Sequence, residues 1–303
     1  FEAIKNTKKN KKRKEILSRF WNSCKGYDFY PFMRLMVPEL DRERTTYGLK
    51  ESKFAKYYIE LLCLHPKNQD AMVLKNWKNP KYAKQSSTNF ADMIYTLLLK
   101  KGWTQQMTNQ KKLTIAHINE KLEELIRAKN GEKLKKILMW LLNRTTAVEQ
   151  KWLIRIILKD MRMNMKHTTI LNQFHPYANE LYNTCTDLKE VCTKCQDPNF
   201  SCSTIAIKVA QPIKPMLAKL AATKQLTKLL INTTYMMETK YDGERIMIHK
   251  KTTDESITYD FYTRNSKNYR DIYGNKFNAI LQKHILIKNC ILDGEMLVYN
   301  KTT

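Results

Sequence analysis

The chain has 303 residues, of which 43% are hydrophobic, so it is long enough for two domains with their own cores. Its 54 lysines and arginines outnumber its 29 acidic residues, which gives a net charge of +25 and favours a polyanionic partner. The longest apolar run, Ile137–Leu142, has six residues, whereas a membrane span needs roughly 18, so we expect no membrane partner.

Residues 1–15 form a basic N-terminal segment around the run KKNKKRK at Lys8–Lys14. Such a run is typical of a nuclear import signal, and equally of the solvated start of a helix, and the sequence leaves both open. The chain begins at Phe1 without a methionine and stops shortly after an apolar run. We therefore expect both ends to be truncated.

Residues 16–206 carry the pattern of helices. Apolar side chains recur at Leu134, Ile137, Leu138 and Leu141, which is the i, i+3, i+4, i+7 spacing of an amphipathic helix. This part of the chain is therefore predicted to be an all-α domain.

The start of one helix in this domain is marked by a capping pattern. Thr146 is followed three residues later by Glu149, which predicts an N-cap and its partner at the start of a helix that continues through Lys159. Gly131 is predicted to separate two helices of this domain.

Four cations in this region are spaced four, four and three positions apart: Lys151, Arg155, Lys159 and Arg162. This spacing predicts a basic stripe along one edge of a helix, which suits contact with a phosphate backbone. An ordinary solvated helix face has the same pattern, so both interpretations stay open.

The seven cysteines are an odd number and follow no signal-peptide pattern, so reduced thiols inside the cell are the expectation. Four of them cluster at Cys185, Cys192, Cys195 and Cys202. The pair Cys192 and Cys195 has the CxxC spacing that begins many zinc sites, but no second CxxC follows. Buried thiols are the alternative to a metal site here.

The pattern changes after a linker predicted at residues 207–217, where Gln211–Pro215 reads QPIKP. A short helix is predicted over Ala218–Leu230. Segments rich in β-branched and aromatic residues then predict strands at Tyr235–Lys240, Arg245–His249, Ile257–Thr263 and Ile291–Tyr299. Residues 218–303 are therefore predicted to be the start of a truncated α/β domain.

A lysine stands between two carboxylates in this second part: Lys240 lies between Glu238 and Asp242, with Gly243 and Arg245 following. An exposed lysine before a hairpin turn is the plain interpretation. The alternative is a nucleophilic amine beside a phosphate-binding arginine, with the carboxylate Glu295 of a later strand available for a metal or a ribose hydroxyl.

Three short motifs occur in order: Lys240–Arg245 (KYDGER), Thr263–Asn265 (TRN) and Leu292–Glu295 (LDGE). They resemble the KxDGxR signature and the two following motifs of ATP-dependent ligases and capping enzymes. The FYPFMRLMVPEL stretch at Phe29–Leu40 and the KPMLA stretch at Lys214–Ala218 widen the resemblance to nearly the whole chain. It is most specific to the ligase IV group of eukaryotic ATP-dependent DNA ligases.

This resemblance implies an all-α DNA-binding domain followed by the first part of an α/β (α+β) nucleotidyltransferase, or adenylation, domain. ATP and Mg²⁺ are the implied cofactors, and Lys240 is the implied nucleophile that becomes adenylated. The remaining implied contacts are adenine at Glu238 and Thr239, the nucleotide at Tyr241, ribose or phosphate at Arg245, the α-phosphate at Arg264, and ribose or magnesium at Glu295.

The resemblance also implies partners and a place in the cell. These are double-stranded DNA with nicks or ends, a coiled-coil scaffold partner bound by C-terminal BRCT repeats outside this sequence, the nuclease Artemis at the helical domain, and the nucleus during non-homologous end joining. The later motifs of the nucleotide pocket are expected beyond Thr303, so the 303 residues alone are not expected to ligate. Where the group has a glycine, this chain has Asn164, which weakens the expectation of a close backbone approach to DNA there.

Two other functions stay open. An RNA ligase or capping enzyme shares the lysine motif but lacks a long helical domain ahead of it. A DNA-binding or partner-docking module with an inactive catalytic remnant is the second, although the lysine, the arginine and Glu295 are all present.

Overall fold

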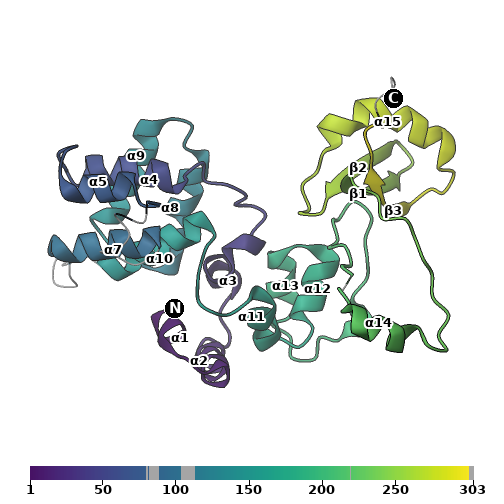
Figure 1. Cartoon of the computed structure of the whole chain (residues 1–303), viewed down its shortest axis with the longest axis horizontal. Helices are drawn as coiled ribbons and strands as arrows, with labels where there is room; N and C mark the ends of the chain where they lie inside the picture. Colours follow the sequence, from purple (N-terminus) through teal and green to yellow (C-terminus); the bar gives the residue numbers. More distant parts are fainter. Residues whose placement is uncertain (80, 82–88, 104–112, 219, 300–303) are drawn as a thin grey trace. The chain divides into compact units, whose positions relative to one another are not determined.

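The computed structural model describes residues 1–79, 81, 89–103, 113–218 and 220–299 (Figure 1). The chain divides into two compact units, of which unit 1 is Phe1–Asn179 with Asp187–Phe200, and unit 2 is Glu180–Thr186 with Ser201–Thr303. Helices come first and strands later, as the sequence predicts. Within the described ranges no helix combines the length and the apolar character that crossing a membrane requires.

Unit 1 is helical. In chain order its helices are α1 (Glu2–Asn6), α2 (Asn10–Ser23), α3 (Tyr30–Met36), η1 (Pro38–Leu40), α4 (Glu51–Leu61), α5 (Gln69–Lys75), α7 (Phe90–Lys100), α8 (Ile115–Arg127), α9 (Gly131–Leu142), α10 (Ala147–Leu158), α11 (His167–Phe174) and α13 (Leu188–Lys194). Helix α12 (Ala178–Cys185) continues from the end of unit 1 into unit 2.

Helix α10 confirms the predicted capping pattern. The Thr146 hydroxyl accepts a hydrogen bond from the Glu149 backbone N–H at 3.3 Å, and the Glu149 carboxylate accepts one from the Thr146 backbone N–H at 2.7 Å. The helix ends at Leu158, because the C-cap residue Lys159 is left-handed, with φ of 56°. Gly131 lies at the junction of α8 and α9, where it is the first residue of α9 and follows the N-cap Asn130.

A buried network of charges joins α3, the segment after η1 and α8. Arg44, which is 1% exposed, donates hydrogen bonds from Nε to Glu123 at 3.0 Å and from Nη1 to the Asn119 side chain at 2.7 Å. Arg34 donates from Nε to the buried Asp41 at 2.7 Å. Each guanidinium thus compensates a carboxylate that burial would otherwise penalise.

Removing one member of this network should leave its partners buried without compensation. We expect Arg44→Ala to lower the free energy of unfolding of unit 1 by about 3–5 kcal/mol, measured by chemical denaturation with far-UV circular dichroism. The control Arg127→Ala removes an exposed arginine at the end of the same helix α8 and should change stability by about 0.5 kcal/mol or less. Equal effects of the two substitutions would contradict the role of the network.

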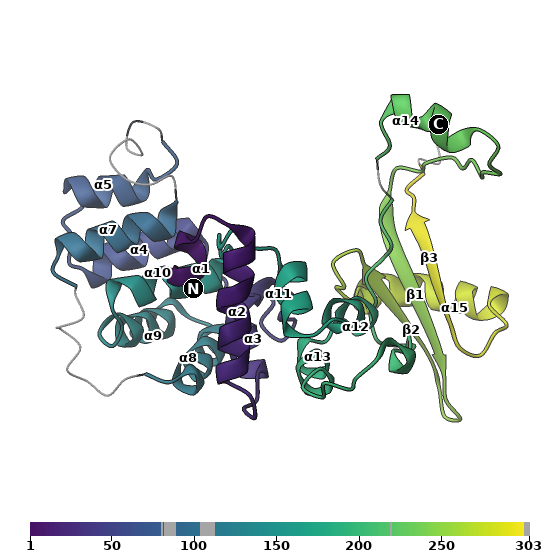
Figure 2. The ribbon, with the colours of Figure 1, turned by 90° about the horizontal axis from the view of Figure 1, so that it is seen from below.

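Unit 2 contains a three-stranded antiparallel sheet in the order β2-β1-β3, with β1 (Glu244–Thr252) in the centre, β2 (Ile257–Thr263) and β3 (Cys290–Met296). Helix α15 (Arg270–His284) covers one face of this sheet (Figure 2). Ile246, Tyr259 and Phe261 form the buried core of that face. A short helix, α14 (Thr223–Leu230), and the 3₁₀ turn η3 (Cys202–Thr204) precede the sheet.

Alternation along β1 sends its residues to both faces. Lys250 points to the helix-covered face, where its ammonium donates to the Ile285 carbonyl at the C-cap of α15. On the other face Tyr262 donates from its hydroxyl to the Ala210 carbonyl at 3.0 Å, so the segment before α14 contacts the sheet. His249 lies on this second face, 0% exposed, with its ring 4.8 Å from that of Tyr262.

One predicted strand is wrong: Tyr235–Lys240 has no regular structure, and residues 231–244 are exposed. A strand is stabilised by the ladder it forms with a neighbour, and among the described residues no strand pairs with this segment. Smaller differences concern ends, since the predicted helix Ala218–Leu230 begins at Thr223 and the predicted strand Ile291–Tyr299 ends at Met296.

The buried imidazole of His249 should make unit 2 sensitive to acid. Neither ring nitrogen has a hydrogen-bond partner in the described structure, and burial lowers the pKa of His249 below its ordinary value of 6.5, against a smaller opposite effect of Asp260. The unfolded chain therefore binds the proton more readily, so stability present above pH 6.5 should be lost as the pH falls through the lowered pKa. Thermal unfolding followed at several pH values measures this.

His249→Gln should flatten that pH dependence, since glutamine does not titrate. The control His284→Gln replaces the exposed histidine at the end of α15 and should leave the wild-type dependence intact. An unchanged profile in His249→Gln would contradict the assignment.

Candidate functional site

The register of the sheet brings the three sequence motifs to one end of it. In the antiparallel pairs, Ile246 at the start of β1 faces Thr263 at the end of β2, and Arg245 faces Glu295 near the end of β3. Directly opposed residues share a face. The motifs Lys240–Arg245, Thr263–Asn265 and Leu292–Glu295 therefore meet although about fifty residues separate the first from the last.

Gly243 is required by the close approach of two strands. A Cβ atom at this position would lie 2.3 Å from the Met296 carbonyl oxygen of β3. The Gly243 N–H donates to the Glu295 carboxylate at 3.2 Å. In the structure the close neighbour of this glycine is therefore the end of β3.

Arg245 is held by two partners. Its Nε and Nη2 donate to the two carboxylate oxygens of Asp293, the former at 2.9 Å, and its Nη1 donates to the Met216 carbonyl at 3.0 Å. The hydrogen bonds that Arg245 donates to Asp293 raise the pKa of Arg245 further above its usual range. The guanidinium therefore has a fixed plane, with N–H groups left over for a ligand.

Asp293 is a residue that the sequence reasoning did not single out. It stands two positions before Glu295 in the same strand, so both carboxylates lie on the face of Arg245. The two-residue spacing of Asp293 and Glu295 was the signal in the sequence that could have identified Asp293. One carboxylate oxygen of Glu295 accepts the hydrogen bond from the Gly243 N–H, and the other oxygen remains available to a ligand.

Lys240 lies in the exposed segment ahead of β1. Within the described residues, its side chain and those of Glu238, Thr239 and Tyr241 make no hydrogen bond or ion pair. Arg264 is exposed in the turn that follows β2, next to the Thr263 that pairs with β1. The structure thus brings Arg245, Glu295 and the Gly243 backbone into contact and leaves the lysine segment open to solvent at the same end of the sheet.

The carboxylates at this end of the sheet suit a magnesium ion better than a metal that needs three or more protein ligands. Mg²⁺ keeps several waters and takes one or two protein carboxylates, and Glu295 has an oxygen to offer. Across the described parts of the chain, no group of three or more histidine, cysteine, aspartate or glutamate side chains could hold a metal. None of the four clustered cysteines forms a disulfide in the described structure, and burial raises the pKa of the Cys192 thiol, which suits a plain buried thiol.

The predicted basic stripe does not form one exposed edge, which corrects that expectation. Lys151 and Arg155 are buried in α10, where Lys151 pairs with Glu2 and Arg155 Nη2 pairs with Asp92 at 2.8 Å. Lys159 is half-buried at the C-cap, and only Arg162 is exposed. Helix α10 packs against α7 along its length, and this is why its cations turn inward to acidic partners.

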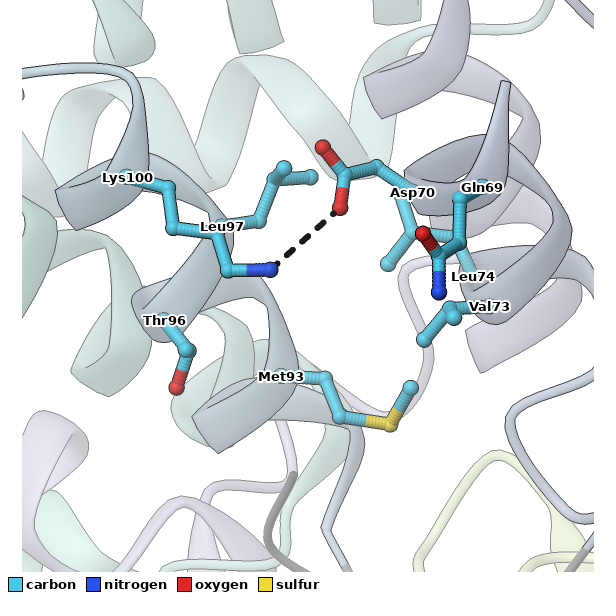
Figure 3. Close-up of a pocket in the computed structure, with 8 residues that line it drawn as sticks. All are labelled: Gln69, Asp70, Val73, Leu74, Met93, Thr96, Leu97 and Lys100. Carbon is cyan, nitrogen blue, oxygen red and sulfur yellow. Dashed lines mark ion pairs between the residues drawn. The ribbon is translucent and has the colours of Figure 1, made fainter. Parts of the chain in front are cut away.

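The described part of unit 1 also contains a hollow. It lies between α5 and α7 and is lined by Val73, Leu74, Met93 and Leu97, with the ion pair of Asp70 and Lys100 at 3.6 Å across it (Figure 3). Gln69 and Thr96 complete its lining, so the hollow mixes apolar and polar side chains, and its one acidic group is already paired with Lys100.

Comparison with known families divides the chain in the same order as the structure. The family described as DNA ligase N terminus matches residues 1–175, and the family described as ATP dependent DNA ligase domain matches residues 215–303. Unit 1 thus contains the first match and the sheet of unit 2 lies within the second.

Similar proteins are known from several eukaryotes. DNA ligase 4 of Gallus gallus is 39% identical over 285 residues, which cover 91% of this chain and 30% of the relative. DNA ligase 4 of Homo sapiens is 38% identical over 295 residues, with the same two shares. DNA ligase 4 of Arabidopsis thaliana is 34% identical over 304 residues, 99% of this chain and 24% of the relative. The chain thus spans less than a third of these relatives' length.

The contact at Gly243 predicts an asymmetry between two glycines of the sheet. Gly243→Ala should force β1 and β3 apart and lower the melting temperature of unit 2 by several degrees, whereas Gly294→Ala should be neutral or slightly stabilising, because nothing lies within 4 Å of its Cβ position. Thermal unfolding of the two variants measures this. The idea fails if Gly294→Ala is the more damaging substitution.

Proposed function

The chain belongs to the family of ATP-dependent DNA ligases, and we propose that it acts in a ligase of the ligase IV group. In this proposal the protein seals DNA breaks through a lysyl-AMP intermediate during non-homologous end joining in the nucleus. The observation that carries it is the sheet register, which gathers Arg245, Glu295 and Arg264 at the end of the sheet where Lys240 lies.

Three steps make up the proposed reaction. The Nζ amine of Lys240 attacks the α-phosphorus of ATP, so that an N–P bond forms and pyrophosphate leaves. The adenylate then passes from Lys240 to the 5′-phosphate at a DNA break. Finally the neighbouring 3′-hydroxyl attacks that phosphorus, forms the phosphodiester bond and releases AMP. In this mechanism the Nζ amine of Lys240 is the protein group that forms a covalent bond to the nucleotide.

The neighbours of Lys240 orient the nucleotide. Arg245, fixed by Asp293 and Met216, presents its remaining N–H groups to ribose or phosphate. Arg264 contacts the α-phosphate, and the second oxygen of Glu295 accepts a ribose hydroxyl or binds magnesium. Adenine and the sugar lie against the segment Glu238–Tyr241. Magnesium, where bound, would supply positive charge to the phosphate oxygens.

Unit 1 is proposed to hold duplex DNA through its phosphates. Repair of breaks at any sequence needs contacts that carry no sequence information, and phosphate contacts meet that need. Among the four cations of the predicted stripe, exposure favours Arg162 and disfavours Lys151 and Arg155. The net charge of +25 supports the same partner.

The coiled-coil scaffold partner and Artemis stay predictions from the family. Two aromatic residues near the start of unit 1 that could be expected to dock a partner are packed into its core: Trp21 and Phe29 are buried, with ring centroids 5.3 Å apart, and both contact Phe174. These rings are therefore not offered as a docking surface.

An inert docking module is the second candidate, favoured by the absence of any hydrogen bond or ion pair of the Lys240 side chain in the described structure. The covalent chemistry separates the two candidates. In a form extended to the length of the relatives, incubation with ATP and Mg²⁺ should add the mass of AMP, and Lys240→Arg should abolish this because arginine has no nucleophilic amine. Intact mass spectrometry with peptide mapping is the measurement.

The control Lys251→Arg changes an exposed lysine of β1 and should keep the adduct. AMP carried by Lys240→Arg, or its absence from the extended wild-type protein, would refute the ligase mechanism. The 303 residues alone are expected to yield no ligated DNA.

A further inference from the structure

The basic run near the start of the chain forms an exposed surface in the structure. Five lysine side chains at the junction of α1 and α2 are exposed, and within the described residues none of their ammonium groups makes a hydrogen bond or an ion pair; they are Lys8, Lys9, Lys11, Lys12 and Lys14. No acidic residue interrupts the run. We call these five lysines the α2 basic face.

Arg13, in the middle of the run, has a different role. It is half-buried, and its Nε donates to the Thr7 carbonyl at 2.7 Å while its Nη1 donates to the Asn164 carbonyl at 3.0 Å. This arginine ties the start of α2 to the turn before α11. The lysines around it are therefore carried on a fixed surface, which is extended by the exposed Lys166 of that turn.

Helix α2 remains attached to α11 beyond this point. Ser18 lies 3.4 Å from the Gln173 side chain, and Trp21 packs edge-on against Phe174 with ring centroids 5.3 Å apart. The apolar residues Leu17 and Trp21 are buried beneath the helix. Burial of one side of α2 leaves its charged side facing solvent.

These lysines do not serve the stability of the helix. The first turn of α2 has no acidic residue, and its N-cap, Lys9, makes no side-chain capping bond. Positive charge at a helix N-terminus opposes the helix dipole, and like charges within a turn repel each other. An ordered surface that keeps such a cluster is better explained by an anionic partner than by folding.

We propose that the α2 basic face binds the phosphate backbone of duplex DNA. The inference rests on the proposed function and names the surface of unit 1 that performs it, in place of the stripe that α10 buries. Because the run is helical from Asn10 onwards, Lys11, Lys12 and Lys14 project from a helix, which suits contact with a phosphate backbone, whereas an import signal bound as an extended peptide would require this helix to unwind.

The test compares two variants of the 303-residue chain with the same loss of charge. The first is K8Q/K11Q/K12Q/K14Q. The matched control, K67Q/K129Q/K133Q/K136Q, removes four other exposed lysines of unit 1 that have no ion pair in the described structure. Binding to two duplexes of unrelated sequence is measured by fluorescence anisotropy between about 50 and 200 mM salt, the range over which phosphate contacts dominate.

The first variant should bind both duplexes at least about tenfold more weakly at the low end of this range, with a salt slope reduced by roughly 2–4, since each lost phosphate contact removes about 0.9. The salt slope of the control variant should differ from that of the wild type by no more than about one. The variant K8R/K11R/K12R/K14R retains the four charges and should bind both duplexes as tightly as the wild type does. The melting temperature of the first variant should equal or exceed that of the wild type, which a merely structural role for these lysines would not produce.

Two failures are distinguishable. If the wild-type chain binds DNA with a steep salt dependence and K8Q/K11Q/K12Q/K14Q binds equally well, the α2 basic face is wrong while the proposed function stands. The inference is also wrong if the control loses as much affinity as the first variant, since total charge would then explain the binding. If the wild-type chain shows no salt-dependent binding to either duplex, the proposed DNA-holding function of unit 1 fails as well.

Discussion

The antiparallel pairing of β1 with both of its neighbours is the constraint on which the candidate site depends. Because β1 starts where β2 and β3 end, residues far apart in the chain meet at one end of the sheet. Gly243 permits this, since any Cβ there would collide with the Met296 carbonyl. The salt bridge from Arg245 to Asp293 then joins the two strands by their side chains, so backbone and side-chain interactions reinforce the same register.

Unit 1 uses its excess of positive charge in two ways. Arg44, Arg155 and Lys151 are buried beside carboxylates and support the packing of helices, because a buried cation must be compensated. The lysines of the α2 basic face are exposed and have no acidic partner in the described structure. A net charge of +25 therefore does not report how much charge is available to a nucleic acid; the distribution of carboxylates in space decides that.

Local patterns predicted local structure well, and the reason is that their partners are close in the chain. The capping pair Thr146 and Glu149 is satisfied within one turn, so four residues of sequence were enough to predict the start of α10. Prediction failed where the deciding partner is distant. Tyr235–Lys240 has strand composition but no neighbouring strand in the described structure, and Lys151 has the spacing of a solvated stripe but lies next to Glu2.

By itself the sequence determined the helical character of the first part, three of the four strands predicted for the second, and the three ordered motifs around Lys240, because these depend on residue type and short spacing. Only the tertiary structure decided that Gly243 serves the contact with β3, that Asp293 and Met216 hold Arg245, and that the accessible cations lie on α2 instead of α10. Each of these depends on which distant segment packs alongside, and burial energies act on neighbours in space whatever their separation along the chain.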